Sequence, residues 1–363
     1  MGIRNPKKIL VAPLDWGLGH TTRCAPIIRH LLHAGHDVTV AGNAAQTNWL
    51  SGSFPGIRTI PLDGYNIRYG RTRRGLIGSI LRQIPHILKT ISREHQWLLQ
   101  VQKDEQFDGI ISDNRYGLHH PEVPSVIMTH QLQIHTGMGL AADSLLRSMH
   151  YRYLQRFSEC WVVDVPGQPN LSGSLAHPPV MPANGKYIGL LSQLDPARQQ
   201  AAEKHLLVLL SGPEPQRSLL SDLLWQQVQG YDGSVAFVEG GDDISSRTSI
   251  PSHITYYTRI TKDALQPLLT NAGMVVCRSG YSTLMDLACL GKKAILIPTP
   301  GQTEQEYLGR YLQAEQVYLS MPQEGFNLNK ALQQAKTFPY RQLDITEDYS
   351  VYKVVLNQWV DRL

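Results

Sequence analysis

The sequence predicts an α/β protein of two domains. One stretch in each half of the chain, residues 8–34 and residues 274–290, reads as a buried strand, a glycine-containing turn and a helix. At 363 residues the chain is long for one hydrophobic core and suits two domains of ordinary size. Hydrophobic residues make up 42% of the chain and charged residues 18%, which is typical of folded globular proteins.

The composition disfavours several classes of protein. The net charge is only +4, which argues against a protein dedicated to binding nucleic acid. No apolar stretch reaches the ~18 residues of a membrane span, and the start lacks the long apolar region of a signal peptide, so we expect a cytoplasmic protein. Histidine spacings typical of zinc sites are absent, so we expect no metal. Four cysteines without CxxC spacing read as reduced core thiols: Cys24, Cys160, Cys277 and Cys289.

The first strand–turn–helix unit opens the chain. Lys8 to Pro13 reads as a buried strand, and residues 23–34 read as an amphipathic helix. The turn between them, LDWGLGH, ends in His20. A Gly-rich turn is needed merely to pack a strand against a helix, so this pattern alone is weak evidence for a ligand site. His20 is therefore either a functional side chain or a histidine satisfied at the start of a helix.

Residues 65–102 combine arginines with apolar side chains at helical spacing. The default prediction is a helix with one buried face. Its basic lead-in is either a solvated loop or a contact for anionic headgroups at a membrane surface. The arginines are Arg68, Arg71, Arg73, Arg74, Arg82 and Arg93.

Polar residues follow the strand predicted at residues 107–112. They are Asp113, Asn114 and Arg115. Ligands of parallel α/β sheets bind beyond the carboxyl ends of the strands. These three side chains are therefore candidates for binding a ligand.

The second domain is predicted to open with a strand from His205 to Leu210, followed by a turn that contains Ser211 and Gly212. A helix with apolar residues at helical spacing is expected at residues 347–363. The predicted layout is a first domain over residues 1–190, a linker over 191–204, a second domain over 205–345 and a C-terminal helix over 346–363.

The stretch from residue 271 to residue 312 is predicted to form a complete βαβ unit. Its first strand ends at a turn, and a helix start with small polar residues follows. Such a helix start offers backbone N–H groups and a partial positive charge to phosphate. Asp286, one turn later, has two interpretations: it accepts both hydroxyls of a ribose, or it is a solvated first-turn acid behind a helix capped by Ser282.

This part of the sequence resembles the C-terminal half of GT-B glycosyltransferases of the MurG type, in family 28. The shared features are CRSG at residues 277–280, an acid eight residues after the arginine, the segment GKKAILIP and a following EQ pair. Members of that family transfer N-acetylglucosamine from UDP to a polyprenyl-linked acceptor. The resemblance implies two Rossmann-like domains that face a central cleft, with a C-terminal helix returning to the first domain.

The resemblance also implies roles for individual residues. His20 would act as general base or hold a phosphate, and Asp15 is a second candidate base. Asp286 would bind the donor ribose, although the family more often has Glu, and Gln305 would bind the sugar hydroxyls. The implied donor-binding set is Ser211, Gly212, Arg259, Ile260, Arg278, Ser279, Gly280, Ser282, Thr283, Asp286, Gln302, Glu304 and Gln305. The implied acceptor-binding set is Gly17, Gly19, Asp113, Asn114, Arg115, His130 and Gln131.

The sequence therefore predicts an inverting, metal-independent glycosyltransferase of the cell envelope. No DxD triplet and no GxxxxGK[ST] loop occurs in it. We expect a UDP-sugar as donor substrate, no cofactor, and a glycan or lipid-linked acceptor, with contact to the cytoplasmic face of the inner membrane. Two alternatives stay open: a nucleotide-sugar epimerase on the same fold, which needs no acceptor, and a non-catalytic nucleotide-sugar-binding partner protein.

Overall fold

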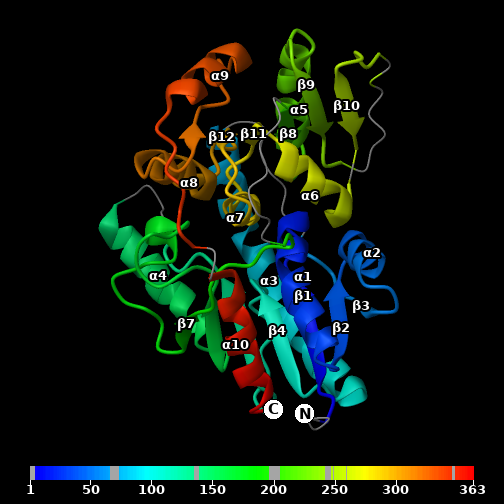
Figure 1. Ribbon diagram of the computed structural model, residues 1–363. Coiled ribbons are helices and arrows are strands. Elements are labelled where there is room, and N and C mark those ends of the chain that lie inside the picture. Colours follow the sequence, from blue (N-terminus) through cyan, green and yellow to red (C-terminus); the bar gives the residue numbers. More distant parts are fainter. Residues whose placement is uncertain are drawn as a thin grey trace. The chain divides into compact units, whose positions relative to one another are not determined.

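The computed structural model describes residues 5–65, 73–134, 139–195, 205–241, 247, 249–258, 260–345 and 348–363. The chain folds into two compact units (Figure 1). The first unit comprises Met1–Ile67, Arg82–Leu191 and Glu347–Leu363, and the second comprises Arg68–Leu81 and Ser192–Thr346. Each unit is built around its own parallel sheet.

The first sheet has seven strands in the order β3-β2-β1-β4-β5-β6-β7, and the pairs between neighbours are parallel. Near-continuous apolar runs such as KILVAP suit strands that helices cover on both faces. The strands are β1 (Lys8–Pro13), β2 (Asp37–Gly42), β3 (Arg58–Pro61), β4 (Gly109–Asp113), β5 (Ser125–Thr129), β6 (Glu159–Val162) and β7 (Gly185–Tyr187). The helical segments are α1 (Leu18–His33), α2 (Ala44–Ser53), α3 (Arg73–Glu105), α4 (Leu140–Leu154), the 3₁₀ turn η1 (Gly173–Leu175) and α10 (Asp348–Val360).

Helix α1 begins five residues earlier than the sequence pattern predicts. Gly17 adopts a positive φ of 82° directly before the helix, and its N–H donates to the Asp15 carbonyl over 2.9 Å. This conformation favours glycine and allows the chain to turn sharply from β1 into α1. His20 therefore lies in the first turn of the helix, where its side chain has a fixed direction.

The C-terminal helix α10 packs on the first unit, which confirms the predicted return of the chain. Its Trp359 ring lies edge-on against Trp161 of β6, with ring centroids 5.7 Å apart. On the α1 side, Asn357 Oδ1 is 2.8 Å from His30 Nε2. Figure 1 shows α10, in red, alongside α1.

The long helix α3 buries less of its apolar face than its spacing predicts. Ile91 is 8% exposed, whereas Ile84 is 44% exposed and Leu88 is 47% exposed. The helix thus presents two large apolar side chains to solvent within one turn. No helix in the described part of the chain is both long enough and apolar enough to cross a membrane.

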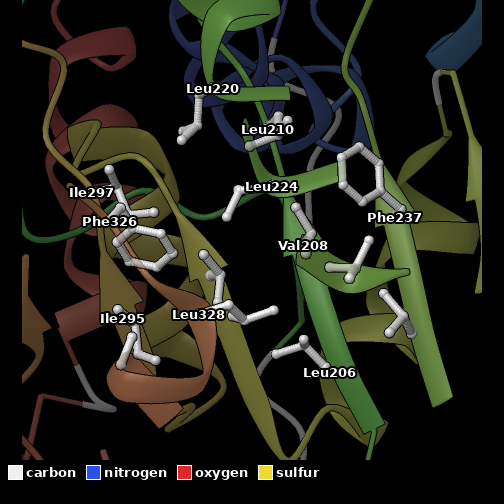
Figure 2. Close-up of a cluster of buried hydrophobic side chains, with 14 of the residues drawn as sticks. Leu206, Val208, Leu210, Leu220, Leu224, Phe237, Ile295, Ile297, Phe326 and Leu328 are labelled. Carbon is white, nitrogen blue, oxygen red and sulfur yellow. The ribbon is translucent and has the colours of Figure 1, made fainter. Parts of the chain in front are cut away.

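The second sheet has six parallel strands in the order β10-β9-β8-β11-β12-β13. Its core contains Val208, Phe237 and Ile295 from three strands, with Leu224 from a covering helix (Figure 2). The strands are β8 (His205–Leu209), β9 (Ser234–Val238), β10 (Ile254–Tyr257), β11 (Met274–Cys277), β12 (Ala294–Leu296) and β13 (Leu319–Ser320). The helices are α5 (Gln216–Val228), α6 (Lys262–Asn271), α7 (Tyr281–Cys289), α8 (Thr303–Ala314) and α9 (Leu328–Thr337).

Candidate functional site

The register of the first sheet brings distant polar segments together at its carboxyl edge. Pro13 of β1 lies opposite Asp113 of β4, which in turn lies opposite Met128 of β5. The loop before α1 and the residues that follow β4 and β5 therefore meet at one edge. This is the side on which α/β sheets bind ligands.

Asp113 is the centre of this edge, and its carboxylate is fully buried. Its Oδ2 lies 3.0 Å from His20 Nδ1 and accepts a hydrogen bond from Arg23 Nε over 3.2 Å, while Arg23 Nη2 donates to Oδ1. Burial alone would raise the pKa of Asp113, but the Arg23 guanidinium and His20 outweigh it and lower that pKa to about 2. Asp113 is therefore ionised across the physiological range.

His20 is held so that it can accept a proton. Its side chain is 15% exposed, and its Nδ1 faces the Asp113 carboxylate. Burial lowers the pKa of His20 below 6.5, and the nearby Arg23 and His130 lower it further, against the opposing effect of Asp113. The imidazole is therefore neutral at pH 7. When Nδ1–H donates to Asp113, Nε2 carries the lone pair that a general base needs.

Arg23 completes this cluster, and the sequence analysis missed it. It is 2% exposed, and its Nη1 lies 2.9 Å from His130 Nδ1. A guanidinium only donates, so His130 Nδ1 accepts and the proton of a neutral His130 sits on Nε2. Arg23 Nη2 also lies 2.9 Å from His20 Nδ1, where it competes with the donor role of that nitrogen. An arginine one turn after His20, directly before the apolar run CAPII, was the available signal.

Two other predicted residues of this unit, Asp15 and Arg115, are held by contacts within the fold. Asp15 Oδ1 accepts a hydrogen bond from the Tyr65 N–H over 2.9 Å, and its carboxyl group packs against Gly64. Arg115 is 0% exposed and pairs with buried Glu94 over 2.7 Å, which is a structural position. An acceptor could not reach the Arg115 guanidinium without opening this core, so the predicted contact is not supported there.

Four further predicted positions line the same edge. Asn114 follows β4 with a φ of 56°, and its side-chain Oδ1 is buried without a hydrogen-bond partner. Gln131 is partly exposed after β5, and its N–H donates to Thr129 Oγ1 over 3.1 Å. Gly17 and Gly19 frame the start of α1.

The second unit has its own polar carboxyl edge. Arg278 follows β11 and is 2% exposed. Its guanidinium donates to neutral acceptors, which include Gln216 O and Gln323 Oε1, each over 2.7 Å. Burial lowers the pKa of Arg278 to about 10, so it still carries a charge at pH 7. No carboxylate among the described residues forms an ion pair with it, so its positive charge is free to attract an anion.

Helix α7 starts at this edge without a side-chain cap. Gly280 is the N-cap residue and has no side chain to cap the helix, so Ser282, two residues later, is not its N-cap. Ser282 and Thr283 are partly exposed in the first turn. Ser279 is buried, and its hydroxyl donates to the Gln305 carbonyl over 2.8 Å.

Asp286 lies within α7 and is 8% exposed, so the alternative of a solvated acid is also wrong. Each oxygen of its carboxylate has a donor: Ser192 Oγ lies 2.6 Å from Oδ1, and Gln193 Nε2 lies 3.2 Å from Oδ2. Burial raises the pKa of Asp286 to about 6, although both hydrogen bonds favour the ionised form. These two partners lie in the predicted linker and were not foreseen.

Two side chains of α8, Gln305 and Glu306, accept hydrogen bonds from the loop that precedes the helix. Gln305 is buried, and its Oε1 accepts a hydrogen bond from the Thr299 N–H over 2.9 Å. Glu306 Oε1 likewise accepts from the Gly301 N–H over 2.8 Å. Gln302 and Glu304 are partly exposed at the start of α8.

The remaining predicted donor-binding positions are Ser211, Gly212, Arg259 and Ile260. Ser211 and Gly212 are exposed beyond the carboxyl end of β8, and Gly212 has a φ of 110°. Ile260 is partly exposed, while Arg259 lies outside the described residues. Within the described residues, no group of three or more His, Cys, Asp or Glu side chains could hold a metal ion.

Most of the second unit is similar to a known domain family. Residues 233–348 match the glycosyltransferase family 28 C-terminal domain. Two curated proteins, from two strains of Methylorubrum extorquens, are 40% identical over 60 residues. Both are named UDP-N-acetylglucosamine--N-acetylmuramyl-(pentapeptide) pyrophosphoryl-undecaprenol N-acetylglucosamine transferase, and the match spans 16% of this chain and 16% of each relative.

Solved glycosyltransferase structures are similar in fold to nearly the whole chain. The glycosyltransferase SnogD from Streptomyces nogalater matches with a TM-score of 0.64 and 13% identity, over 99% of this chain and 100% of that one. MurG of Acinetobacter baumannii matches with a TM-score of 0.58 and 15% identity, over 98% and 100%. At these identities the likeness establishes the fold. The chain has the GT-B fold, as predicted.

Proposed function

We propose that this protein is an inverting, metal-independent glycosyltransferase that moves a hexose from a UDP-sugar to a hydroxyl of a glycan or lipid-linked acceptor. The observation that carries the proposal is the pair formed by His20 and Asp113. It combines a neutral imidazole with a buried carboxylate that orients it through Nδ1. This arrangement suits removal of a proton from a hydroxyl group.

In the proposed reaction, His20 Nε2 accepts the proton of the acceptor hydroxyl. The acceptor oxygen attacks the anomeric carbon, and the bond from that carbon to the nucleoside diphosphate breaks with its electron pair on the phosphate oxygen. One direct displacement inverts the anomeric configuration. Asp113 stabilises the imidazolium that forms, since it stays ionised and is hydrogen-bonded to Nδ1.

Residues 233–348, which match the family 28 domain, supply most of the proposed donor site. We assign Asp286 to the ribose, the N–H groups at the start of α7 to the diphosphate and Gln305 to the sugar. The positive charge of buried Arg278, at the carboxyl edge of the second sheet, stabilises the negative charge of the leaving diphosphate. N-acetylglucosamine is the favoured sugar, because the curated relatives carry it in their names.

A lipid-linked acceptor at a membrane surface is the favoured acceptor class. The names of the curated relatives include pyrophosphoryl-undecaprenol, a lipid-linked group. In this chain, Ile84 and Leu88 expose apolar surface on α3, after a segment rich in arginine. Apolar side chains that follow basic residues in sequence suit contact with an anionic lipid surface, although the side chains of Arg68, Arg71, Arg73, Arg74 and Arg82 lie outside the described residues.

Calorimetric titration of UDP-sugars tests the donor assignment. We expect one UDP-sugar to bind with micromolar affinity, and Asp286→Ala to weaken that binding at least about tenfold, equivalent to about 1.4 kcal/mol. The same sugar should then be transferred to a hydroxyl acceptor and stay unchanged without one. Failure of every uridine nucleotide to bind would refute the UDP-sugar assignment, and sugar isomerisation without acceptor would indicate an epimerase.

Donor binding should weaken in acid. The pKa of Asp286 is raised to about 6, so the fraction of carboxylate able to accept two ribose hydroxyls falls as the pH drops below that value. We expect the Kd of UDP-N-acetylglucosamine to rise up to about tenfold per pH unit below pH ~6. Its diphosphate is a diester and lacks the second ionisation of a phosphate monoester near pH ~6.

Asp286→Asn is the control for this pH dependence. The amide does not titrate, so the variant should bind weakly and with the same affinity at pH ~5 and ~7. An unchanged Kd of the wild-type protein between these two pH values would contradict the role of Asp286 as the ribose acceptor.

A further inference from the structure

The segment Ser192–Asp195 lies as a strap across α6 and α7. Leu194 is 3% exposed, and its carbonyl lies 3.8 Å from Cys289 Sγ at the end of α7. The Asp195 N–H donates to Gln266 Oε1 over 3.2 Å, and the Asp195 carboxylate pairs with Lys262 over 2.7 Å. The strap is thus attached to both helices at its far end, beyond its contacts with Asp286.

At its near end the strap presents two adjacent donors to one carboxylate. Ser192 Oγ and Gln193 Nε2 each bond a different oxygen of Asp286, over 2.6 and 3.2 Å. Vicinal hydroxyls, such as the two of a ribose, bind a carboxylate with the same one-to-one pattern. Ser192 Oγ is further fixed because it accepts the Leu194 N–H over 3.0 Å.

We propose that Ser192 and Gln193 are internal competitors of the donor ribose for Asp286, so that nucleotide binding displaces the strap from α7. This inference rests on the proposed role of Asp286 in donor binding. The Asp286 side chain is only 8% exposed, and both of its oxygens already have a donor. A carboxylate oxygen can accept more than one hydrogen bond, so the competition depends on access: the buried carboxylate is covered by these two side chains, and a ribose reaches it when they give way.

Displacement of the strap also reaches beyond the nucleotide site. Leu191 is the last residue of the first unit in this part of the chain, and Ser192 is the first of the second. The strap therefore begins where the chain passes from the first unit into the second. Exchange of Ser192 for a ribose hydroxyl makes the attachment of the strap to α7 depend on donor binding.

Titration of two nucleotides into matched variants tests the competition. The probes are UDP and 2′,3′-dideoxyuridine diphosphate, which lacks both ribose hydroxyls. Ser192→Ala should tighten binding of UDP about threefold to tenfold, because the ribose no longer has to replace a hydrogen bond to a charged group. Binding of the dideoxy nucleotide should change less than about twofold, because it does not compete for Asp286.

Two further variants make the result specific. Gln193→Ala removes the second donor and should act in the same direction, which guards against a folding defect of either variant. Ser148→Ala is the matched control, because this exposed serine on α4 contacts only the Ser144 carbonyl over 3.1 Å among its described partners. It should leave both affinities unchanged.

Hydrogen exchange of the strap amides gives an independent readout. The Leu194 and Asp195 N–H groups are bonded to Ser192 Oγ and Gln266 Oε1. UDP should increase their exchange rate, whereas the dideoxy nucleotide should not. Ligands usually protect amides near their site, so this expected sign is diagnostic.

The outcomes separate this inference from the proposed function. UDP binding that depends on Asp286, but is weakened or unchanged in Ser192→Ala and protects the strap amides, overturns the competition and leaves the donor site intact. The serine would then be a positioning residue for Asp286. Absence of UDP binding to the wild-type protein overturns both.

Discussion

Replacement of Asp113 by asparagine should lower the kcat of glycosyl transfer by about 10³-fold to 10⁴-fold. The amide has no charge to stabilise a protonated His20. Its Nδ2 can donate to His20 Nδ1, which places the imidazole proton on Nε2 and removes the lone pair that accepts the acceptor's proton. Steady-state kinetics with the UDP-sugar and a hydroxyl acceptor measure this loss, and donor affinity should not change.

The same substitution should destabilise the fold by about 3–5 kcal/mol, because it leaves the buried Arg23 guanidinium without its anion. Urea unfolding at pH 7 measures the difference. The pKa of Asp113 in the folded protein is about 2, below that of an unfolded aspartate. Its stabilisation is therefore complete above pH ~4 and is lost as the pH falls toward 2, where wild type and variant should converge.

A double variant separates activity from stability. In Arg23→Met with Asp113→Leu, both members of the buried pair become apolar, so much of the lost stability should return. The transfer rate should stay low, because His20 still lacks its carboxylate. Full activity in either variant would contradict the assignment of Asp113 as the residue that orients the base.

Local sequence patterns predicted the two α/β units and placed His20 after the first strand, although strands β3 and β13 were not predicted. They were insufficient for the partners of that histidine. Asp113 faces His20 because Pro13 and Asp113 share a register between β1 and β4, and strand pairing is not visible in a single sequence. Arg23 was missed for a related reason. The helix was predicted to begin at Arg23, so His20 and Arg23 were not expected to share its first turns.

The donor side shows the same limit over a longer distance. The acid at position 286 is recognisable from its place in a βαβ unit, but Ser192 and Gln193 reach it across more than 90 residues of sequence. A linker without periodicity gives no signal that its polar side chains are buried. Arg115 illustrates the opposite error: a polar residue at the end of a strand suggested a ligand contact, yet its pairing with Glu94 makes it part of the core.

Comparison of His20→Gln with Asp15→Asn should identify the catalytic base. His20→Gln removes the only nitrogen in the cluster that both faces Asp113 and is partly exposed, and we expect its kcat to fall about 10²-fold to 10⁴-fold with donor affinity unchanged. Asp15→Asn keeps an oxygen that can accept the Tyr65 N–H, so its kcat should change less than about tenfold.

The pH profile distinguishes a base from a residue that merely supports the fold. Because burial lowers the pKa of His20, the kcat/KM of the wild-type protein should fall on the acid side only below pH 6.5. That acid limb should persist in Asp15→Asn and disappear in His20→Gln, whose residual rate has no imidazole to protonate. A His20→Gln variant that retains the rate, together with an inactive Asp15→Asn, would transfer the role of base to Asp15. The Asp113 carboxylate would then serve only to neutralise Arg23.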